Sequence, residues 1–513
     1  MIQDVGERYD RTPYTRHCYP GAHPDRLCTM GLLFGLSPAS TAGCRILEVG
    51  CAGGGHLVPM AAGLPGATLV GLDASGEAIT SARSLADDLG LDNLELRHGL
   101  LEDLDDADGP FDYLIAHGVY SWVPAQVQEQ LLTCCRALLA PHGIAYISAN
   151  TLPGWHLRGA IRDAMRRHTR DIEDPLESAR EARALLDLLA SSVSDDERAW
   201  KAVLDQEQRW LRDATETYLF HDHLAPDNEA VDITEFLRRA GRNQLQFLAD
   251  ADPASMWLRQ EALREHVARL APERVGREQM GDWLRGRTFR QTLLCREELA
   301  VREEPVVQRV GMLLATTELV LETDHSTPER VAFRDARGNL GYADDPLVVA
   351  LLGALASAHP ADLPFGSLLR AVRELVEWEV PAGDLAQLLL TLWKRGEAEL
   401  TCRDRRIASD PGQYPRTTEL VLDQATRPDH VVTNLRHEVV QIDVFDRPIL
   451  QLLDGTRDRR ALCEQLTQHA LGGTLPVVRD GRPLTDPAEV RRLWEVLVGE
   501  RIPRYAGQAL LTA

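Results

Sequence analysis

The chain has 513 residues, enough for about three domains of ordinary size, and its 44% hydrophobic content is that of a globular protein with a substantial core. The formal net charge is −22, from 56 basic and 78 acidic residues, which argues against nucleic acid as a main partner because phosphate contacts require basic patches. The nine cysteines form no C-x-x-C pair, the N-terminus has no signal-peptide pattern, and no apolar run is long enough to span a bilayer. We therefore expect a cytoplasmic protein with reduced thiols and no membrane insertion.

The first informative stretch predicts a strand, a tight loop, a helix and a second strand. An apolar run at 46–49 is followed by small residues at 50–55, a helical segment at 56–62 and a second apolar run at 67–72 that ends on Asp73. This order is half of a doubly wound nucleotide-binding fold. An acid at the end of the second strand can accept the hydroxyls of a ribose.

The loop favours S-adenosylmethionine over a dinucleotide. Gly50, Ala52 and Gly55 fit the dinucleotide pattern G-x-G-x-x-G only loosely. The same residues also read E-x-G-x-A-x-G, from Glu48 to Gly54. An acid beside a glycine turn suits a ligand that carries a cationic amino acid and no phosphate, and S-adenosylmethionine is such a ligand.

The remaining strands complete an α/β sheet only late in the chain. A sheet of this kind is expected to close with a helix and an antiparallel strand pair, and no such pair precedes residue 244. We therefore expect two insertions in the catalytic domain, at 156–217 and 254–284, which serve as a lid or dimer interface or have no function of their own. The expected strands are 94–98, 111–117, 145–148, 244–248 and 288–295, and the expected helices are 23–36, 78–89, 127–139 and 233–240.

Aromatic residues follow the fourth and fifth expected strands. In an open α/β sheet the ligand lies beyond the carboxyl ends of the strands, so these residues should face the sulfonium. Ring faces stabilise ammonium groups by about 0.5–2 kcal/mol each, which suits a lysine or another amine as the acceptor. Each ring could equally pack its own loop against the sheet. The expected catalytic residues are Tyr14, His117, Tyr120, Trp122, Asn150 and Trp155.

No metal site is expected, because His98, His117 and His156 do not share a metal-ligand spacing. His117 could relay a proton or hydrogen-bond its own loop. The expected cofactor-binding residues are Glu48, Gly50, Cys51, Ala52, Gly54, Asp73, Ala74, Leu100, Leu101 and His117.

Five motifs give the chain a resemblance over nearly its whole length: Y-D-x-x-P-Y at 9–14, E-x-G-C-A-x-G-G at 48–55, H-G-V-Y-S-W-V-P at 117–124, N-T-x-P-G-W at 150–155 and F-R-Q-T-L-L-C at 289–295. The chain resembles bacterial methyltransferases that carry a methyltransferase regulatory domain, among them the lysine methyltransferases that modify outer-membrane proteins. The resemblance implies S-adenosylmethionine as the cofactor, a lid that bears Tyr14, and winged-helix-like C-terminal parts. It departs at Leu100, where relatives usually place an Asp for the adenine amino group. Adenine must then be held by apolar contact, a backbone N–H, Glu102 or Asp103.

The second half of the chain predicts two winged-helix-like units. Helical segments at 347–357, 364–374 and 383–395 precede a strand at 396–401. A second unit has helical segments at 446–453, 459–469 and 487–497, the last capped by Asp486. The third helix of the first unit is basic only at its end, so a protein-binding or structural role is favoured over DNA binding. The expected domains are 1–43 (an N-terminal helix or lid), 44–297 (the methyltransferase), 298–410 (the middle winged-helix-like domain) and 411–513 (the C-terminal winged-helix-like domain).

Three functions remain open from the sequence. The first is an N-methyltransferase for lysine in a protein or peptide. The second is a methyltransferase for a small amine in specialised metabolism. The third is a degenerate methyltransferase that acts as a binding module, which the intact glycine loop and Asp73 argue against. A homodimer is compatible with all three.

Overall fold

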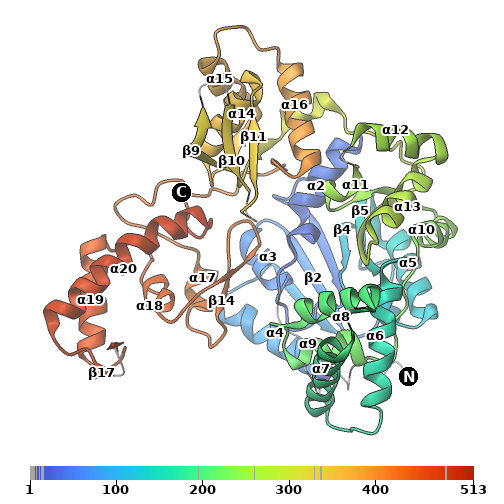
Figure 1. Cartoon of the computed structure of the whole chain (residues 1–513), viewed down its shortest axis with the longest axis horizontal. Helices are drawn as coiled ribbons and strands as arrows, with labels where there is room; N and C mark the ends of the chain where they lie inside the picture. Colours follow the sequence, from blue (N-terminus) through green and yellow to red (C-terminus); the bar gives the residue numbers. More distant parts are fainter. Residues whose placement is uncertain are drawn as a thin grey trace. The chain divides into compact units, whose positions relative to one another are not determined.

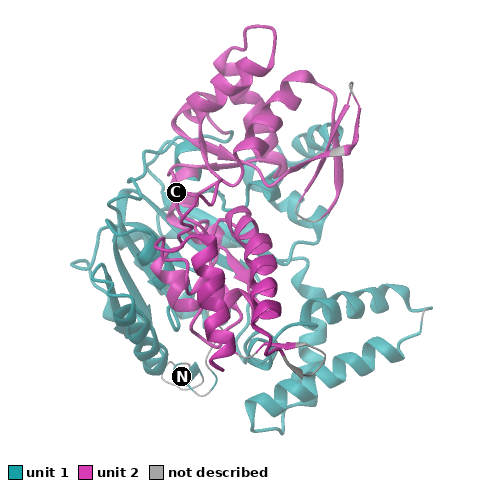
Figure 2. Cartoon of the chain, turned by 90° about the vertical axis from the view of Figure 1, so that its left-hand side faces the viewer, with its two compact units in different colours: residues 1–17, 30–304 teal, residues 18–29, 305–513 magenta. Residues whose placement is uncertain are grey.

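The computed structural model describes residues 6, 9, 10, 12, 17–194, 196–258, 260–327, 330–335, 338–475, 477–479 and 482–513. The chain divides into two compact units, one of residues 1–17 and 30–304 and one of residues 18–29 and 305–513 (Figure 2). Helix α2, Pro24–Leu33, begins in the second unit and ends in the first. The expected N-terminal region 1–43 is thus divided between the units.

The first unit is built on one seven-stranded sheet of order β3-β2-β1-β4-β5-β7-β6 (Figure 1). Neighbouring strands among β1 to β5 run parallel, and β7 is antiparallel to both β5 and β6. The closing strands expected at 244–248 and 288–295 therefore belong to the sheet that contains Ile46, as predicted. The strands are β1 Arg45–Val49, β2 Thr68–Asp73, β3 Leu94–His98, β4 Phe111–Ala116, β5 Leu139–Asn150, β6 Leu245–Asp250 and β7 Phe289–Arg296.

The central strands are apolar because both faces of the sheet are covered. Strand β1 buries four successive residues, 46–49, and β4 buries 113–116, which is the continuous pattern of a parallel strand between helix layers. Strand β5 starts at Leu139, six residues before the expected position. The helices of the fold are α3 Leu57–Gly63, α4 Gly76–Asp88, α5 Ala125–Leu138 and α10 Ile233–Arg242, with α11 Pro253–Met256, α12 Glu261–Leu270 and α13 Arg274–Arg285 between β6 and β7.

The predicted helical insertion between β5 and α10 has a hydrophobic core of its own, to which Ile161, Leu186, Leu204 and Leu211 contribute. Asp174 caps α7 by accepting the backbone N–H of Glu177. The insertion comprises α6 Trp155–His168, α7 Pro175–Ser192, α8 Arg198–Leu211, α9 Glu216–Leu219 and the π-helical turn η4 Phe220–Leu224 (Figure 1).

The second unit contains the three expected helices of the middle domain, α14 Pro346–Ala358, α15 Phe365–Leu375 and α16 Ala382–Arg395. They accompany a small sheet of order β12-β8-β13, in which β13 Glu399–Thr401 pairs with β8 Leu314–Thr316. Strand β12 is Leu363–Pro364, and a separate sheet holds β9 Val320–Thr327, β10 Arg330–Arg334 and β11 Leu340–Ala343. The predicted helices and wing-like strands are present. Strand β8 lies upstream of the expected helical segments, which begin at residue 347.

The C-terminal part packs around a core that includes Trp494 and Tyr505. Asp486 caps α20 by accepting the backbone N–H of Glu489, as expected, but the helix continues to Gly507, ten residues beyond its expected end. The elements are α17 Glu419–Gln424, β14 Val431–Thr433, β15 Val439–Gln441, α18 Asp446–Leu450, α19 Arg459–Leu471, β16 Val478–Arg479, β17 Arg482–Pro483 and α20 Pro487–Gly507.

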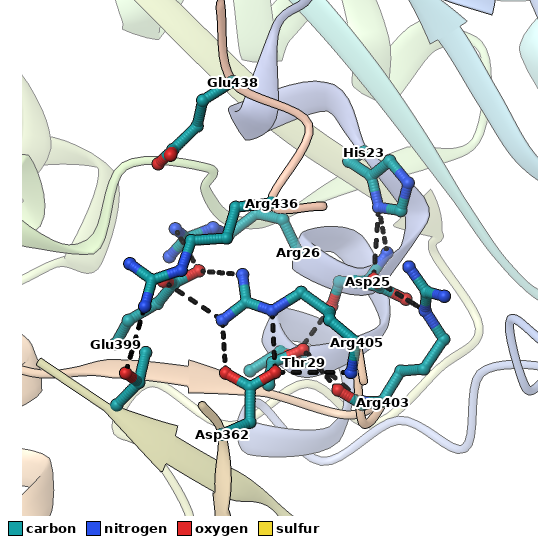
Figure 3. Close-up of polar contacts among 12 residues, drawn as sticks. His23, Asp25, Arg26, Thr29, Asp362, Glu399, Arg403, Arg405, Arg436 and Glu438 are labelled. Carbon is teal, nitrogen blue, oxygen red and sulfur yellow. Dashed lines mark hydrogen bonds and ion pairs between the residues drawn. The ribbon is translucent and has the colours of Figure 1, made fainter. Parts of the chain in front are cut away.

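A buried ionic cluster ties the start of α2 to the middle domain within the second unit (Figure 3). Arg405 donates to both carboxylate oxygens of Asp362, at 2.8 and 2.6 Å, and pairs with Glu399 at 3.2 Å. Arg403 donates to both oxygens of Asp25, at 3.1 and 3.0 Å. Residues 18–29 are therefore part of the core of this unit.

Candidate active site

The loop after β1 adopts backbone conformations that suit small residues. Gly50, Ala52 and Gly54 all have positive φ, at +75°, +46° and +74°. A Cβ on Gly50 would lie 2.6 Å from a methyl group of Val119. The backbone N–H of Gly50 donates to the Leu72 carbonyl at 2.8 Å, which joins the loop to the end of β2.

Asp73, the last residue of β2, organises both neighbouring loops. Its Oδ2 accepts the backbone N–H of Ala52 and its Oδ1 accepts that of Ser75, each at 2.8 Å. A carboxylate has about four lone-pair sites, so each oxygen retains capacity for a ribose hydroxyl. The carbonyl of the next residue, Ala74, contacts His98 Nε2 at 3.1 Å, which fixes the exit of β2 against that of β3.

Glu48 is the residue that best fits a cationic ligand. Its side chain is buried and its Oε2 has no hydrogen-bond partner. Burial, and then the nearby charge of Asp73, raise the pKa of Glu48 to about 8. A cation beside Glu48 would offset the cost of burying its negative charge. The carboxylates of Glu48 and Asp73 therefore suit the amino group of S-adenosylmethionine. Burial likewise raises the pKa of Cys51 well above its usual value, so its thiol lines the loop as a neutral group.

The loop expected to contact adenine has Leu100 at the position where a carboxylate was expected from the resemblance. The backbone of Leu100 makes a hydrogen bond within the loop. The backbone N–H of Leu100 donates to Asp103 Oδ2 at 2.7 Å, while Glu102 is exposed. Leu101 begins the short turn η2, Leu101–Asp103, and packs against the core beneath β4. The carboxylate of Asp103 therefore turns toward its own loop, and Leu100 and Leu101 offer apolar contact.

On the acceptor side, His117 follows β4 and is held by a side chain from β5. Its Nδ1 lies 2.8 Å from the hydroxyl of Tyr146, which in turn donates to Gln291 Oε1 at 3.1 Å. His117 is half-buried, and burial lowers its pKa to about 3. The imidazole is therefore neutral at physiological pH, and so low a pKa makes it a weak proton acceptor.

The expected aromatic residues separate into two groups. Tyr120 is completely buried, packs edge-on against Phe236 with ring centroids 5.0 Å apart, and receives a hydrogen bond from Arg239 at 3.4 Å. Trp122 and Trp155 meet edge to face, with centroids 6.3 Å apart. Tyr120 thus packs its own loop against α10, whereas the two tryptophans form a pair. Tyr14 lies outside the described residues.

Asn228 and Arg158, which were not among the expected site residues, contact Trp155. Trp155 Nε1 donates to Asn228 Oδ1 at 2.7 Å, and the guanidinium of Arg158 lies 5.0 Å from the Trp155 ring centroid. Asn150 is buried at the end of β5, and its Nδ2 has no hydrogen-bond partner. A buried amide without a hydrogen-bond partner costs about 1–3 kcal/mol, so a ligand that accepts a hydrogen bond from Asn150 would offset this cost.

The described residues contain no group of three or more His, Cys, Asp or Glu side chains that could hold a metal ion. Within the same part of the chain, no helix is sufficiently long and apolar to cross a bilayer.

Family models match three parts of the chain. A methyltransferase domain matches residues 46–143, a predicted methyltransferase regulatory domain matches 215–296, and the PKMT C-terminal winged helix domain matches 413–510. Together with the sheet, the glycine loop and the acids Glu48 and Asp73, they define a class I methyltransferase that uses S-adenosylmethionine. The segment matched as regulatory includes β6 and β7, so it completes the catalytic sheet.

Relatives extend this assignment to the whole chain. RP789, an uncharacterized protein of Rickettsia prowazekii, is 31% identical over 98% of this chain and 93% of its own length. The chain belongs to the family of that protein, bacterial methyltransferases with a regulatory domain and a PKMT-type winged helix domain. RP028 of the same organism is 31% identical over 47% of this chain and 96% of its own. The structure of PKMT2 from Rickettsia typhi in complex with AdoHcy has the same fold, with a TM-score of 0.88 and 23% identity over 98% of this chain and 100% of that one.

Proposed function

We propose that this methyltransferase transfers the methyl group of S-adenosylmethionine to the side-chain amine of lysine in a protein. The observation that carries the proposal is the Trp122–Trp155 pair, which follows β4 and β5 at the edge where the cofactor's methyl group is expected. Ring faces stabilise a partly methylated ammonium group by about 0.5–2 kcal/mol each. The PKMT winged helix domain and the likeness to PKMT2 of Rickettsia typhi support a protein acceptor.

The residue roles form part of the proposal. Glu48 would hold the cationic amino acid of the cofactor. The backbone of the loop from Gly50 to Gly54 would contact the cofactor, and Asp73 would accept the ribose hydroxyls. Ala74, Leu100 and Leu101 would line the adenine. Asn150 would contact the acceptor or the methionine part of the cofactor. Tyr14 remains a predicted lid residue, and Tyr120 would act only by packing.

The experiment that tests the proposal is labelling with isotopic S-adenosylmethionine in a lysate of the source organism, followed by mass spectrometry of separated protein and metabolite fractions. We expect label in protein. Label only in metabolites would favour the second candidate, a small-amine methyltransferase, and cofactor binding without transfer to either fraction would favour a binding module.

The proposal also covers the cellular compartment and the charge of the acceptor. We propose a cytoplasmic enzyme, which its nine cysteine thiols support because such proteins are typical of reducing compartments. The net charge of −22 supports a basic acceptor over nucleic acid.

Exposed Leu188 and Trp210 on the insertion support a homodimer interface, which analytical ultracentrifugation of the full chain would test. A catalytic domain of residues 44–297 is part of the proposal, and the end of β7 at Arg296 supports its C-terminal boundary.

A further inference from the structure

The loop after β4, residues 117–124, contacts both the cofactor loop and the end of β5. The side chain of Val119 lies against the cofactor loop, because a Cβ on Gly50 would come within 2.6 Å of a Val119 methyl group. The backbone N–H of Asn150, at the end of β5, donates to the hydroxyl of Ser121 at 2.8 Å. The position of this loop therefore affects the shape of the cofactor site.

Two carbonyl groups of the loop, one on each side of Trp122, accept hydrogen bonds from other segments. The Ser121 carbonyl accepts the backbone N–H of Glu229 at 2.8 Å. The Val123 carbonyl accepts the side-chain amide of Gln128, on α5, at 3.3 Å. Because both neighbours of Trp122 are held, the backbone that carries this ring is fixed at two points.

Arg239, on α10, makes hydrogen bonds with both of these supports. Its guanidinium donates to Gln128 Oε1 at 2.8 Å and to Glu229 Oε1 at 2.9 Å. Its Nε donates to Glu235 Oε1 at 2.8 Å, and its Nη1 lies 3.4 Å from the Tyr120 hydroxyl. Gln128 Nε2 closes the network by donating to Glu229 Oε2 at 3.2 Å. The planar guanidinium has five N–H donors in a fixed fork, so one side chain orients several acceptors together.

Removal of this guanidinium would weaken both supports. Gln128 is almost completely buried, so its carbonyl oxygen would be left inside the protein without the donor that Arg239 provides, which is unfavourable. The carboxylates of Glu229 and Glu235 would lose the cation that they share and would then repel each other. Glu229 is the residue whose backbone N–H holds the Ser121 carbonyl. Loss of Arg239 should therefore release the loop after β4.

We propose that Arg239 is a positioning residue for methyl transfer: through Gln128 and Glu229 it holds the loop after β4 against the glycine loop. The contact of Val119 with the glycine loop makes this a proposal about the cofactor site, and that part rests only on the class of enzyme. The part that concerns Trp122 as a contact of the acceptor rests on the proposed amine acceptor.

The proposal also gives the regulatory segment a part in the reaction. Glu229, Glu235 and Arg239 lie within residues 215–296, the stretch matched by the regulatory-domain model. They reach the loop after β4 through side chains and one backbone N–H. A change in this segment can therefore alter cofactor affinity and turnover through the loop that it holds.

The test compares Arg239→Ala with Arg238→Ala in the full chain. Arg238 is the matched control because it precedes Arg239 on α10 and pairs with the same Glu235 on the exposed surface. The position of the loop is followed by the fluorine NMR signal of Trp122 in protein labelled with fluorotryptophan, assigned with Trp122→Phe. Cofactor affinity is measured by calorimetry, and turnover with poly-L-lysine as the acceptor.

Further variants separate positioning from loss of stability. Arg239→Lys keeps the charge but has no planar fork, so it should recover only part of the turnover. Guanidinium ion added to Arg239→Ala should raise its turnover, because the Arg239 side chain is 20% exposed and solvent reaches its site. Gln128→Met removes the link between Arg239 and the Val123 carbonyl. It should reproduce part of the effect, and it decides the question if Arg239→Ala does not fold.

We expect the Trp122 signal to shift or broaden in Arg239→Ala, with turnover lower by about tenfold and S-adenosylmethionine affinity weaker by about threefold. Arg238→Ala should match wild type in all three measurements. An unchanged Trp122 signal in Arg239→Ala, or wild-type affinity and turnover despite a shifted signal, would overturn the positioning role. A wild-type enzyme that leaves poly-L-lysine unmethylated, while the Trp122 signal and cofactor affinity still respond to Arg239→Ala, would instead contradict the amine acceptor.

Discussion

Asp73 accepts the backbone N–H of Ala52 at 2.8 Å, so the acid expected to bind the ribose also holds the glycine loop. Ala52 has a φ of +46°, an unfavourable conformation for alanine, and this hydrogen bond helps to maintain it. One carboxylate thus serves two purposes at the cofactor edge. Its substitution should affect both the ribose contact and the shape of the loop.

Asp73→Ala should weaken S-adenosylmethionine binding by at least tenfold, since a hydrogen bond to a charged group contributes about 1.5–3 kcal/mol. Calorimetric titration measures the change. Asp92→Ala, which removes an exposed carboxylate from the turn before β3, is the matched control and should bind normally. Equal affinities for the two variants would show that Asp73 does not contact the cofactor.

The affinity for S-adenosylmethionine should rise as the pH approaches about 8 and should fall at higher pH, where the cofactor's own amino group loses its charge. The pKa of Glu48 is raised to about 8 in the unliganded structure, so the carboxyl is protonated below that pH and must lose its proton to pair with a cation. Titrations between about pH 6 and 9 would measure this linkage. Glu48→Gln should remove the Glu48 contribution and leave only the titration of the cofactor itself; an unchanged profile in that variant would refute the pairing.

The same raised pKa has the opposite effect on the stability of the unliganded protein. Between the unfolded value of 4.5 and the folded value of about 8, the native state binds more protons than the unfolded state. The free energy of unfolding contributed by Glu48 is therefore fully present below pH 4.5 and is lost as the pH rises through about 8. Urea unfolding of wild type and Glu48→Gln across this range should show a steeper decline in wild type.

Leu100→Asp should retain or improve cofactor affinity. The substitution restores the carboxylate that relatives usually place at this position, and Leu100 is only partly buried in this chain. Leu101→Asp is the informative comparison, because Leu101 packs against the core and a charge there should reduce stability. A large loss of affinity in a folded Leu100→Asp protein would mean that adenine approaches this loop in another geometry.

Asp362→Ala should destabilise the second unit by about 3–5 kcal/mol, because it leaves the buried guanidinium of Arg405 without its main partner. The two side chains are only 5% and 0% exposed. Arg491→Ala removes an exposed helical pair with Glu495 and should cost less than about 1 kcal/mol. Chemical unfolding compares the two variants. Similar effects would indicate that water reaches Arg405 in solution.

The sheet could be predicted from the sequence because its strands are short apolar runs that end in loops of small or acidic residues. Glu48, the glycine loop and Asp73 occur within one stretch, so their proximity follows from local chain geometry. The closing strands were found from the need to complete the sheet. Helix α20 was expected to end at residue 497, but it continues through Pro503 to Gly507.

The contacts that hold His117 were harder to predict, because they join residues that are distant in the sequence. His117, Tyr146 and Gln291 are brought together by strand order, and nothing in a local pattern marks a tyrosine or a glutamine inside a strand as functional. Tyr120 shows the reverse problem: its place after β4 suggested the active site, but its ring turns into the core against Phe236. The hydrogen bonds between Arg403 and Asp25, which lie 378 residues apart in the chain, are likewise invisible in a local pattern.

The most direct test of the account is the chemical form of the methyl group transferred to protein. Labelled protein would be hydrolysed in acid and its amino acids separated, with base treatment of a parallel sample to release any methyl ester. The account predicts that the label is stable to base and elutes as mono-, di- or trimethyllysine. Label released as methanol, or recovered in any other amino acid, would contradict lysine methylation.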